Sequence, residues 1–478
     1  MGLIHIIKYE KTKSLLQLII DQQKLDQLIS MGNAEFPDGH FILNFYHPMS
    51  ETEFSEIVEK TLTSETDFFY CCQPSEQFLV LALDKLISIY EPDRTDSLNF
   101  QQNIDGIKSK TISNGSQFNL KRKPLFIGSL KFPSEKNESL WEDFNAGEWF
   151  LPKIILIKEG SQHYLVVNSF HYQGFEKYIA HSLRLLDEDS ALKEELQTPQ
   201  ILSSSEVSFE EWSKEIDSAL HKITDGTIQK VVLARYADFH LSQKPKLSGL
   251  LYELEDNYKE CYTFAFRSGG SVFLGSSPEK LFSIHDGIIE TDALAGSFPR
   301  GESAELDSSL ENNLLNDLKN LEEHKSVVNF LTDRLSRVSN KIIQNGKPIV
   351  KKFSNIQHLY TPIKAEIKEG VSAISVIENL HPTPAVCGMP SSVANQMIEN
   401  LETFERGLYA GALGWVGLDN SAEMFVGIRS AIVKDNFMRA FAGCGIVNGS
   451  NSLAEFNETS LKLKPILSLF KNETINQS

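Results

Sequence analysis

The chain has 478 residues, of which 41% are hydrophobic and 23% are charged. These proportions are typical of a globular protein with a packed core, and they exclude a chain that is disordered throughout. Lys and Arg number 46 against 64 Asp and Glu, which gives a formal net charge of −18. A surface this acidic repels nucleic acid and anionic lipid, so neither is an expected partner.

The cysteines and the N-terminal segment indicate a compartment. The five cysteines are odd in number and lack CxxC spacing, which argues against a disulfide framework or a zinc site and favours reducing conditions. Adjacent Cys71 and Cys72 would face opposite sides of a strand. Charged residues interrupt segment 1–20, which therefore lacks the apolar core of a signal peptide, and no stretch approaches the ~20 apolar residues of a spanning helix. We expect a cytoplasmic protein without a membrane segment.

Secondary-structure signals are clearest after residue 206. Ser208-Phe-Glu-Glu211 has the spacing of a capping box and predicts a helix to about Thr224. Asp286-Gly287 predicts a hairpin turn between two short strands. From Asp307 to about Ile343 the charged, helical periodicity predicts one long helix. In chain order, the other expected elements are strands over 229–235, 261–266, 271–274, 281–284 and 288–291, a helix over 391–401, strands over 410–416, 424–433 and 437–447, and a helix over 452–470.

These elements together indicate a fold class. Consecutive hairpins with helices gathered between them predict an α+β architecture with large antiparallel sheets. Polar stretches at residues 101–123 and about 186–205 interrupt the pattern. Neither is rich enough in Pro and Gly to force a domain boundary, so we interpret both as surface loops of one fold.

Two acidic clusters are candidate metal ligands. Glu322-Glu323-His324 lies midway along the predicted long helix. Glu455 and Glu458 are three residues apart, so they point to one face of the last helix. Carboxylates at two distant helical positions can converge on a hard cation, and Mg²⁺ takes one or two protein carboxylates while leaving room for an anionic substrate. Solvated glutamates on helix surfaces are the alternative interpretation.

Lys230 is a candidate base. It begins an otherwise apolar strand, where the period of two places it on one face with Val232 and Ala234. Desolvation by apolar neighbours would lower its pKa, as a lysine base requires. A lysine at the end of a strand that extends its amine to water has the same sequence pattern.

Three loop segments are further candidates. Glycines in Gly443-Cys444-Gly445 allow backbone N–H groups to approach an anion, although tight-turn packing also explains them. Glu279 follows a strand in a turn, where side chains reach a pocket, and is otherwise an ordinary loop carboxylate. His381 begins the rigid segment His-Pro-Thr-Pro and is by default a structural histidine.

Taken together and in order, these segments resemble the chorismate-binding enzymes, and within that family most closely the isochorismate synthases. A weaker N-terminal resemblance lies in residues 126–132, Trp141 and Leu151-Pro152. The matching blocks are KVVLAR (230–235), GSSPE (275–279), ALAGSFPRG (293–301), LEEHKSVV (321–328), HPTPAVCGMP (381–390), ERGLYAGALGW (405–415), GIRSA (427–431), FAGCGIV (441–447) and AEFNETSLK (454–462).

The resemblance implies a reaction and a site. Water adds at C2 of chorismate while the C4 hydroxyl leaves and the ring double bonds shift, for menaquinone or siderophore synthesis. By similarity, Lys230 is the general base and Glu279 the general acid. Glu323 and Glu458 would bind Mg²⁺, with Glu455 nearby. The implied substrate-binding residues are Ala295, Gly296, Ser297, His381, Thr383, Tyr409, Arg429, Gly443, Cys444, Gly445 and Lys462.

The resemblance also separates this chain from other members of the family. Anthranilate synthases carry glutamine where Lys230 stands, and aminodeoxychorismate synthases have a nucleophilic lysine where this chain has Ala295. A glutamine-amidotransferase partner is therefore not expected. Two alternatives stay open: a salicylate synthase, which eliminates pyruvate from bound isochorismate, and a non-catalytic chorismate-binding module.

The resemblance implies the overall organisation as well. The family fold has two large antiparallel sheets packed face to face, with helices outside and the pocket between the sheets. Residues 1–205 would form the less characteristic N-terminal part of this layered fold, and residues 206–472 the chorismate-binding catalytic region. A monomer is expected.

Overall fold

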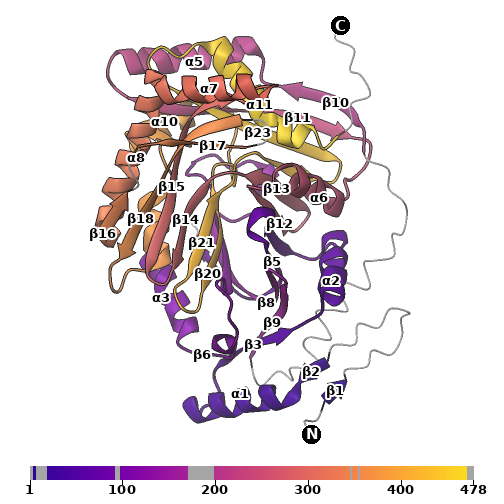
Figure 1. Cartoon of the computed structure of the whole chain (residues 1–478). Helices are drawn as coiled ribbons and strands as arrows, with labels where there is room; N and C mark the ends of the chain where they lie inside the picture. The colour runs from indigo at the N-terminus through magenta and orange to yellow at the C-terminus, as the bar shows by residue number, and fades with distance from the viewer. Residues whose placement is uncertain are drawn as a thin grey trace.

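The computed structural model describes residues 4–6, 19–91, 97–170, 199–344, 347–353 and 356–470. Within these ranges, β1 and β2 form a small separate ribbon, and 21 strands join in one hydrogen-bonded network. Helices cover the outside: α5, α10 and α11 lie along one end, α8 on one flank, and α2 and α6 on the opposite flank (Figure 1). The expected α+β class with antiparallel sheets and outer helices is confirmed.

The helices and strands have the following bounds. The helices are α1 Gln22–Glu35, α2 Glu51–Thr63, α3 Ser97–Lys108, α5 Phe209–Thr224, α6 Leu247–Asn257, α7 Ala304–Asn316, α8 Leu318–Val338, α9 Ala373–Leu380, α10 Ser391–Leu401 and α11 Ser452–Leu467. The strands are β1 Ile4–Ile6, β2 Ile19–Asp21, β3 Ile42–Pro48, β4 Phe68–Gln73, β5 Phe78–Glu91, β6 Thr111–Ser113, β7 Pro124–Leu130, β8 Gly147–Glu159, β9 Gln162–Phe170, β10 Ile201–Glu206, β11 Lys230–Leu241, β12 Tyr262–Ser268, β13 Ser271–Ser277, β14 Lys280–His285, β15 Ile288–Pro299, β16 Ser339–Gln344, β17 Ile349–Lys352, β18 Ile356–Ile367, β19 Gly388–Met389, β20 Ala412–Gly417, β21 Ala422–Val426, β22 Ser430–Lys434 and β23 Phe437–Ile446.

Strands from the N-terminal and C-terminal parts of the chain pair directly with each other. β4 pairs with β12, β7 with β20 and β10 with β11, all antiparallel. Only β3 and β6, among the described strands, form a parallel pair. The part of the predicted loop at 101–123 that continues α3 is helical, and most of the described part of 186–205 belongs to β10. The division of the chain near residue 205 stays a prediction.

The strands bury apolar side chains on both of their faces. On β4, Phe69 and Cys71 belong to the central core, whereas Tyr70 and Cys72 belong to a second core beneath the outer helices. This alternation confirms that Cys71 and Cys72 face opposite sides of one strand. All five cysteines are buried and unpaired. Because apolar material lies on both faces of the sheet, its strands have little freedom to shift.

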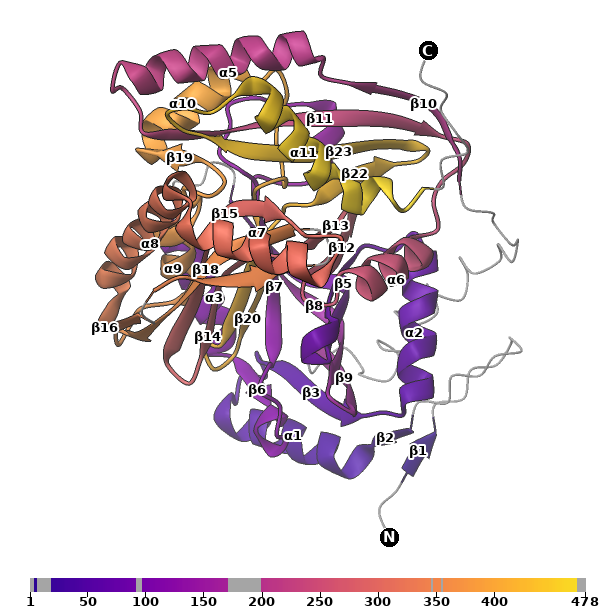
Figure 2. The same ribbon diagram turned by 45° about the horizontal axis from the view of Figure 1, so that its top comes forward.

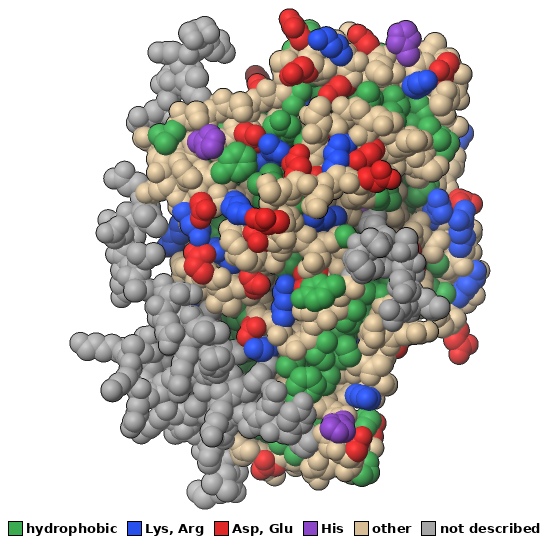
Figure 3. All heavy atoms as spheres, turned by 180° about the vertical axis from the view of Figure 1, so that it is seen from behind, with side chains coloured by type: hydrophobic (Ala, Val, Ile, Leu, Met, Phe, Trp, Pro, Cys, Tyr) green, Lys and Arg blue, Asp and Glu red, His purple; other side chains and the backbone are tan. Residues whose placement is uncertain are grey.

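The surface carries charges of both signs. Figure 3 shows acidic and basic side chains interspersed on the face seen from behind, without a continuous basic area. None of the helices in the described ranges combines the length and apolar character needed to cross a membrane.

Several local predictions are confirmed. Helix α5 begins after Ser208, whose side chain accepts from the amide of Glu211 in a full capping box. The hairpin between β14 and β15 turns at Asp286 and Gly287, with φ of 50° and 75°. Both values lie in the left-handed region that a type I′ turn requires.

Two predicted elements are wrong in their continuity. The expected helix 307–343 is two helices followed by strand β16. It breaks at Asp317, which has an extended backbone and accepts from the amide of Asn320 at 2.8 Å as the N-cap of α8. The expected strand 424–433 is β21 and β22, separated at Gly427–Arg429, where Arg429 has a φ of 52°. The sequence pattern continues through both places, but the backbone of Asp317 is not helical and that of Arg429 is not extended.

The cap of α5 makes a testable contribution to local stability. Replacing Ser208 by alanine removes the side-chain acceptor of the Glu211 amide, which has no partner within the helix. The loss should destabilise the start of α5 by about 1 kcal/mol. We expect hydrogen exchange at the Glu211 amide to become about fivefold faster in Ser208→Ala. Ser208→Thr keeps the cap and should exchange almost like the wild type. Equal exchange in all three proteins would contradict this role.

Candidate active site

Most of the candidate residues line one cavity of about 350 Å³. Its walls come from β15 and α8 on one side and from β23 and α11 on the other, and these elements gather at one end of the molecule (Figure 2). The lining includes the predicted residues Glu279, Ala295, Gly296, Ser297, Glu323, Tyr409, Arg429, Gly443, Gly445, Glu455, Glu458 and Lys462. Lys230, His381, Thr383 and Cys444 lie behind this lining.

Glu279 is a buried carboxyl group at the base of the cavity. It lies in the two-residue connection between β13 and β14, where its amide donates to Ser277 Oγ at 3.3 Å and its carbonyl accepts from the amide of Val426 at 3.0 Å. Thr383 donates its hydroxyl to Oε1 of Glu279 at 3.4 Å. Burial raises the pKa of Glu279 from 4.5 to about 7, although Lys230 and Thr383 act to lower it. A carboxyl group with this pKa holds its proton near neutral pH, as a general acid requires.

Lys230 is buried at the start of β11, and its amine reaches the wall of the cavity. Its Nζ donates to Oε1 of Glu323 at 2.6 Å. On the same strand face, Val232 lines the cavity, as the period of two predicts. A Cβ at Gly445 would lie only 2.7 Å from Cε and 3.1 Å from Nζ of Lys230. A larger residue at 445 would therefore displace the amine of Lys230, because the lysine side chain passes against the backbone of β23.

The segment Ala295–Ser297 forms a bulge in β15 that faces helix α8. The register with β18 shifts at Gly296, which has a φ of 79°. The amide of Ser297 donates to the side-chain oxygen of Asn320 at 3.1 Å. One turn along α8, His324 contacts the carbonyl of Ala295 at 3.3 Å through Nδ1 and Thr361 at 2.8 Å through Nε2. Since a carbonyl only accepts, Nδ1 carries the proton. These contacts fix the face of α8 that carries Glu323.

Arg429 provides a positive charge in the cavity. It is buried, and no hydrogen bond or ion pair to another described residue engages its guanidinium. Its φ of 52° is unusual for arginine. The amide of Ser276 donates to its carbonyl at 3.1 Å, and a Cβ at Gly275 would lie 2.6 Å from that oxygen. This packing holds the strained backbone, and a desolvated guanidinium without a partner is suited to bind an anion.

Helix α11 brings two glutamates and a lysine to the cavity. Lys462 pairs with Glu458 at 2.7 Å and also donates to the carbonyl of Gly443 at 2.9 Å. Burial acts to raise the pKa of Glu458, but Lys462 and Arg429 bring it below its ordinary value. Glu455 is buried and pairs with Lys319 of α8 at 3.4 Å. The two helices are thus joined by charge across the mouth of the cavity.

The remaining predicted residues support this lining from behind. His381 contacts the carbonyl of Ala410 at 2.8 Å through Nε2, and Ala410 lines the cavity. Cys444 is fully buried, and burial raises the pKa of its thiol. Tyr409, by contrast, lines the cavity and stacks on Phe441 with ring centroids 5.1 Å apart.

The sequence interpretation missed His358, Lys319 and Asn320, which also line the cavity. Nδ1 of His358 lies 2.8 Å from Oγ of Ser297, and its Nε2 has no hydrogen-bond partner among the described residues. Burial, with Arg429 and Lys462, holds the pKa of His358 well below 6.5, so the ring is neutral. The alternation of β18 gives no signal for His358, because it places this residue on the strand face that carries the exposed Lys364.

The carboxylates of α8 and α11 fit a hard divalent cation by their donor chemistry. Glu323, Glu455 and Glu458 present oxygen atoms to one cavity. No three His, Cys, Asp or Glu side chains in the described ranges already form a compact metal cage. Mg²⁺ does not need one, because it binds through one or two carboxylates and keeps water or substrate oxygens as its other ligands. In this structure, the positive charge beside each of these glutamates is that of its lysine partner.

The chain belongs to the family of chorismate-binding enzymes. The family model described as "Chorismate binding enzyme" matches residues 31–471. The isochorismate synthase MenF of Bacillus subtilis is 33% identical over 354 residues, which cover 73% of this chain and 75% of that protein. The vibriobactin-specific isochorismate synthase of Vibrio cholerae is 34% identical over 273 residues, covering 57% of this chain and 69% of that protein.

A solved structure shows the same fold over nearly the whole chain. The menaquinone-specific isochorismate synthase MenF of Escherichia coli superposes with a TM-score of 0.76. The comparison covers 93% of this chain and 100% of that chain at 22% identity. At this identity the likeness concerns the fold, which is the layered fold expected from the sequence.

The raised pKa of Glu279 predicts a titration near neutrality. The carboxyl group should be protonated below pH 7 and lose its proton above it, because burial disfavours the charged form. Infrared difference spectra against Glu279→Gln should show a protonated-carboxyl band that disappears with a midpoint at about 7. Thr383→Val removes a hydrogen bond to the charged form and should move the midpoint upward. A midpoint at the ordinary value of 4.5 would contradict this assignment.

Proposed function

We propose that this protein is an isochorismate synthase, which converts chorismate to isochorismate. The observation that carries the proposal is the position of buried Glu279, whose pKa burial raises to about 7, and of the buried amine of Lys230 at the wall of the same cavity in a chorismate-binding enzyme. Three of the cations around this cavity, Lys230, Arg429 and Lys462, favour an anionic substrate although the whole chain is acidic. Relatives named as isochorismate synthases support the same reaction.

In the proposed reaction, Lys230 and Glu279 transfer one proton each. Lys230 takes a proton from water as the water oxygen forms a bond to C2 of chorismate. The ring double bonds shift, the bond between C4 and its hydroxyl breaks, and Glu279 gives its proton to the departing hydroxyl. One water is consumed and one is released, so the net change is an isomerisation. Each acid–base group should contribute about 10²–10⁴-fold to the rate.

The substrate carboxylates would bind to cationic and hydrogen-bonding groups of the lining. Arg429 is the strongest candidate because it is buried without a partner among the described residues. Lys462 and Tyr409 lie beside Gly443, since Lys462 donates to its carbonyl and the hydroxyl of Tyr409 would be 2.9 Å from a Cβ there. The bulge at 295–297 would contact the ring from the opposite wall, and His381 and Thr383 would support the pocket.

Mg²⁺ is the proposed cofactor, with Glu323 and Glu458 as ligands and Glu455 binding directly or through water. When bound, the ion supplies positive charge that offsets the glutamates and holds the ring carboxylate of the substrate. Engaging Glu323 and Glu458 in this way would release Lys230 and Lys462 from their present ion pairs. The lysines would then be available for water and substrate.

Other features of the proposal extend beyond the site. The product would serve menaquinone or siderophore synthesis, and we propose a cytoplasmic monomer that acts without a glutamine-amidotransferase subunit. Salicylate synthase is the alternative enzyme, because it uses the same lysine, glutamates and metal site. The similarity to proteins named as isochorismate synthases favours the first activity.

Incubation with chorismate and Mg²⁺, followed by chromatography, tests the reaction. We expect isochorismate, whereas salicylate with pyruvate would support the alternative and unchanged chorismate a non-catalytic module. Lys230→Ala and Glu279→Gln should each lower kcat by about 10²–10⁴-fold with the fold intact, because each removes one proton-transfer group. Lys246→Ala changes an exposed lysine and serves as the matched control. Normal turnover by either site variant would refute its role.

Metal dependence is a separate prediction. Stripping divalent ions with a chelator should abolish turnover, and added Mg²⁺ should restore it. Glu458→Gln should raise the Mg²⁺ concentration needed for half-maximal activity by about tenfold or more, because it weakens one oxygen ligand. Glu253→Gln, at an exposed position of α6, should leave the requirement unchanged. Full activity after complete chelation would remove Mg²⁺ from the mechanism.

A further inference from the structure

A second cavity, of about 380 Å³, adjoins the first at the ion pair between Lys230 and Glu323. Glu323 and Lys319 line both cavities. Glu279 is part of the first lining only, whereas Lys230 is part of the second. The second lining also includes Gln229, Glu322, Ser326, Val447 and Asn448. The proposed base and the proposed acid therefore face different spaces.

The partition between the two cavities is thin. Lys230 Nζ and Glu323 Oε1 are 2.6 Å apart and form part of it. Gly445 of the first lining contributes no side chain, and a Cβ there would meet both members of the pair, at 3.1 Å from Nζ and 3.2 Å from Oε1. The amine is thus within reach of a molecule in the first cavity while it stays in contact with the second.

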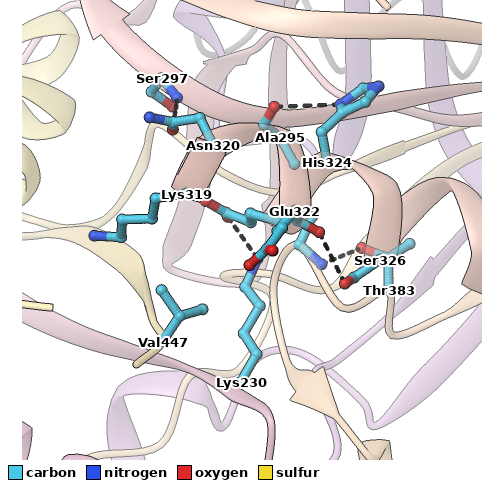
Figure 4. Close-up of polar contacts among 12 residues, drawn as sticks. Lys230, Ala295, Ser297, Lys319, Asn320, Glu322, His324, Ser326, Thr383 and Val447 are labelled. Carbon is cyan, nitrogen blue, oxygen red and sulfur yellow. Dashed lines mark hydrogen bonds and ion pairs between the residues drawn. The ribbon is translucent and has the colours of Figure 1, made fainter. Parts of the chain in front are cut away.

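The second cavity opens to solvent and has a mixed lining. Figure 4 shows Lys230 extending between Val447 on one side and Ser326 on the other, with Lys319 and Glu322 above it. Gln229 and Asn448 are exposed at its edge. Water is retained where a space offers two or more polar partners, and the charged groups of the partition meet that requirement.

The proposed reaction creates a need for such a space. A ligand pocket of a few hundred Å³ typically buries 70–90% of its ligand's surface, so chorismate in the first cavity closes the way by which it entered. The attacking water must still reach C2 on the side of Lys230, and a filled cavity excludes water. An entrance on the side of the base would remove this conflict.

We propose that the second cavity delivers the water that Lys230 activates, while chorismate occupies the first. This inference rests on the proposed function and assigns a role to residues that do not touch the substrate. Water enters between Ser326 and Val447, gives one proton to Nζ of Lys230 and forms its new bond to C2. The hydroxyl that leaves C4 takes the proton of Glu279 and departs from the first cavity. Ser326 and Val447 flank this entrance, and the proposal requires only that the space between them stays open.

Filling the entrance tests this role. Ser326 is half-buried on α8, and its hydroxyl donates to the carbonyl of Glu322 at 2.9 Å. Ser326→Leu adds apolar volume to the second cavity, and leucine is a better helix former than serine, so α8 should persist. We expect kcat to fall by about tenfold or more with KM for chorismate nearly unchanged, the pattern of a change that spares substrate binding.

Two control variants separate the effect of added volume in the second cavity from the effects of losing a hydroxyl or of changing α8 itself. Ser336→Leu makes the same change on the same helix at an exposed position outside both cavities, where the hydroxyl likewise bonds to a preceding carbonyl. It should behave like the wild type. Ser326→Ala removes the hydroxyl without adding volume and should also keep a normal kcat. If Ser326→Ala is as slow as Ser326→Leu, the hydroxyl and not the open space matters, and the proposal fails.

The outcomes separate this proposal from the proposed function. Isochorismate formation by the wild type tests the function by itself. If the wild type is active and Ser326→Leu has the same kcat, the second cavity does not carry water. A rise in KM for chorismate or in the Mg²⁺ requirement, at unchanged kcat, would assign the cavity to substrate or metal entry instead. Should Ser326→Leu fail to fold, Val447→Phe fills the same space from β23's side and must show the same fall in kcat.

Discussion

The pairing of lysines with glutamates across three elements is the interaction on which the site depends. Lys230 of β11 pairs with Glu323 of α8, Lys462 with Glu458 within α11, and Lys319 of α8 with Glu455 of α11. A charge as buried as Lys230 or Glu455 is costly to desolvate unless it has a partner. The pairs therefore explain how three glutamates occupy one cavity of a folded protein. The first pair joins α8 to β11, and the third joins α8 to α11.

Ion pairs of this kind are weak evidence for stability and better evidence for function. Replacing a buried pair by apolar side chains of similar volume is often neutral or stabilising, so stability alone does not favour keeping three of them. A divalent cation that binds the glutamates would exchange one positive partner for another. The lysines would be released together with the binding of the metal, so assembly of the proposed metal site would free the amine of Lys230, the candidate base. Because the displaced lysines remain beside the cavity, the cation makes the cavity more positive, which suits an anionic substrate despite the net charge of −18 on the chain.

Local signals in the sequence predicted much of this structure, and long-range packing decided the rest. The capping box at Ser208 and the turn at Asp286-Gly287 are confirmed because both depend on neighbours within four residues. The break at Asp317 was missed because its cap lies inside a continuous helical pattern. His358 was missed for a different reason. Its neighbours on β18 are ordinary strand residues, and only the bulge at Gly296 and the packing of α8 bring it to the cavity.

The same distinction applies to the chemical properties of the candidate groups. The sequence places Lys230 on an apolar strand and Glu279 in a turn, and both could have been surface residues. Glu279 acquires a pKa near 7 because the fold buries it beneath the cavity, where Lys230, Thr383, Lys462 and Arg429 only partly offset the desolvation. Lys230 acquires its position because Gly445 leaves space for it beside β23. A carboxyl group that keeps its proton and an amine that stands at the border of two cavities are products of packing between distant segments. The different environments that the fold gives to Glu279 and Lys230 therefore suit them to different proton-transfer roles, which their residue types alone do not determine.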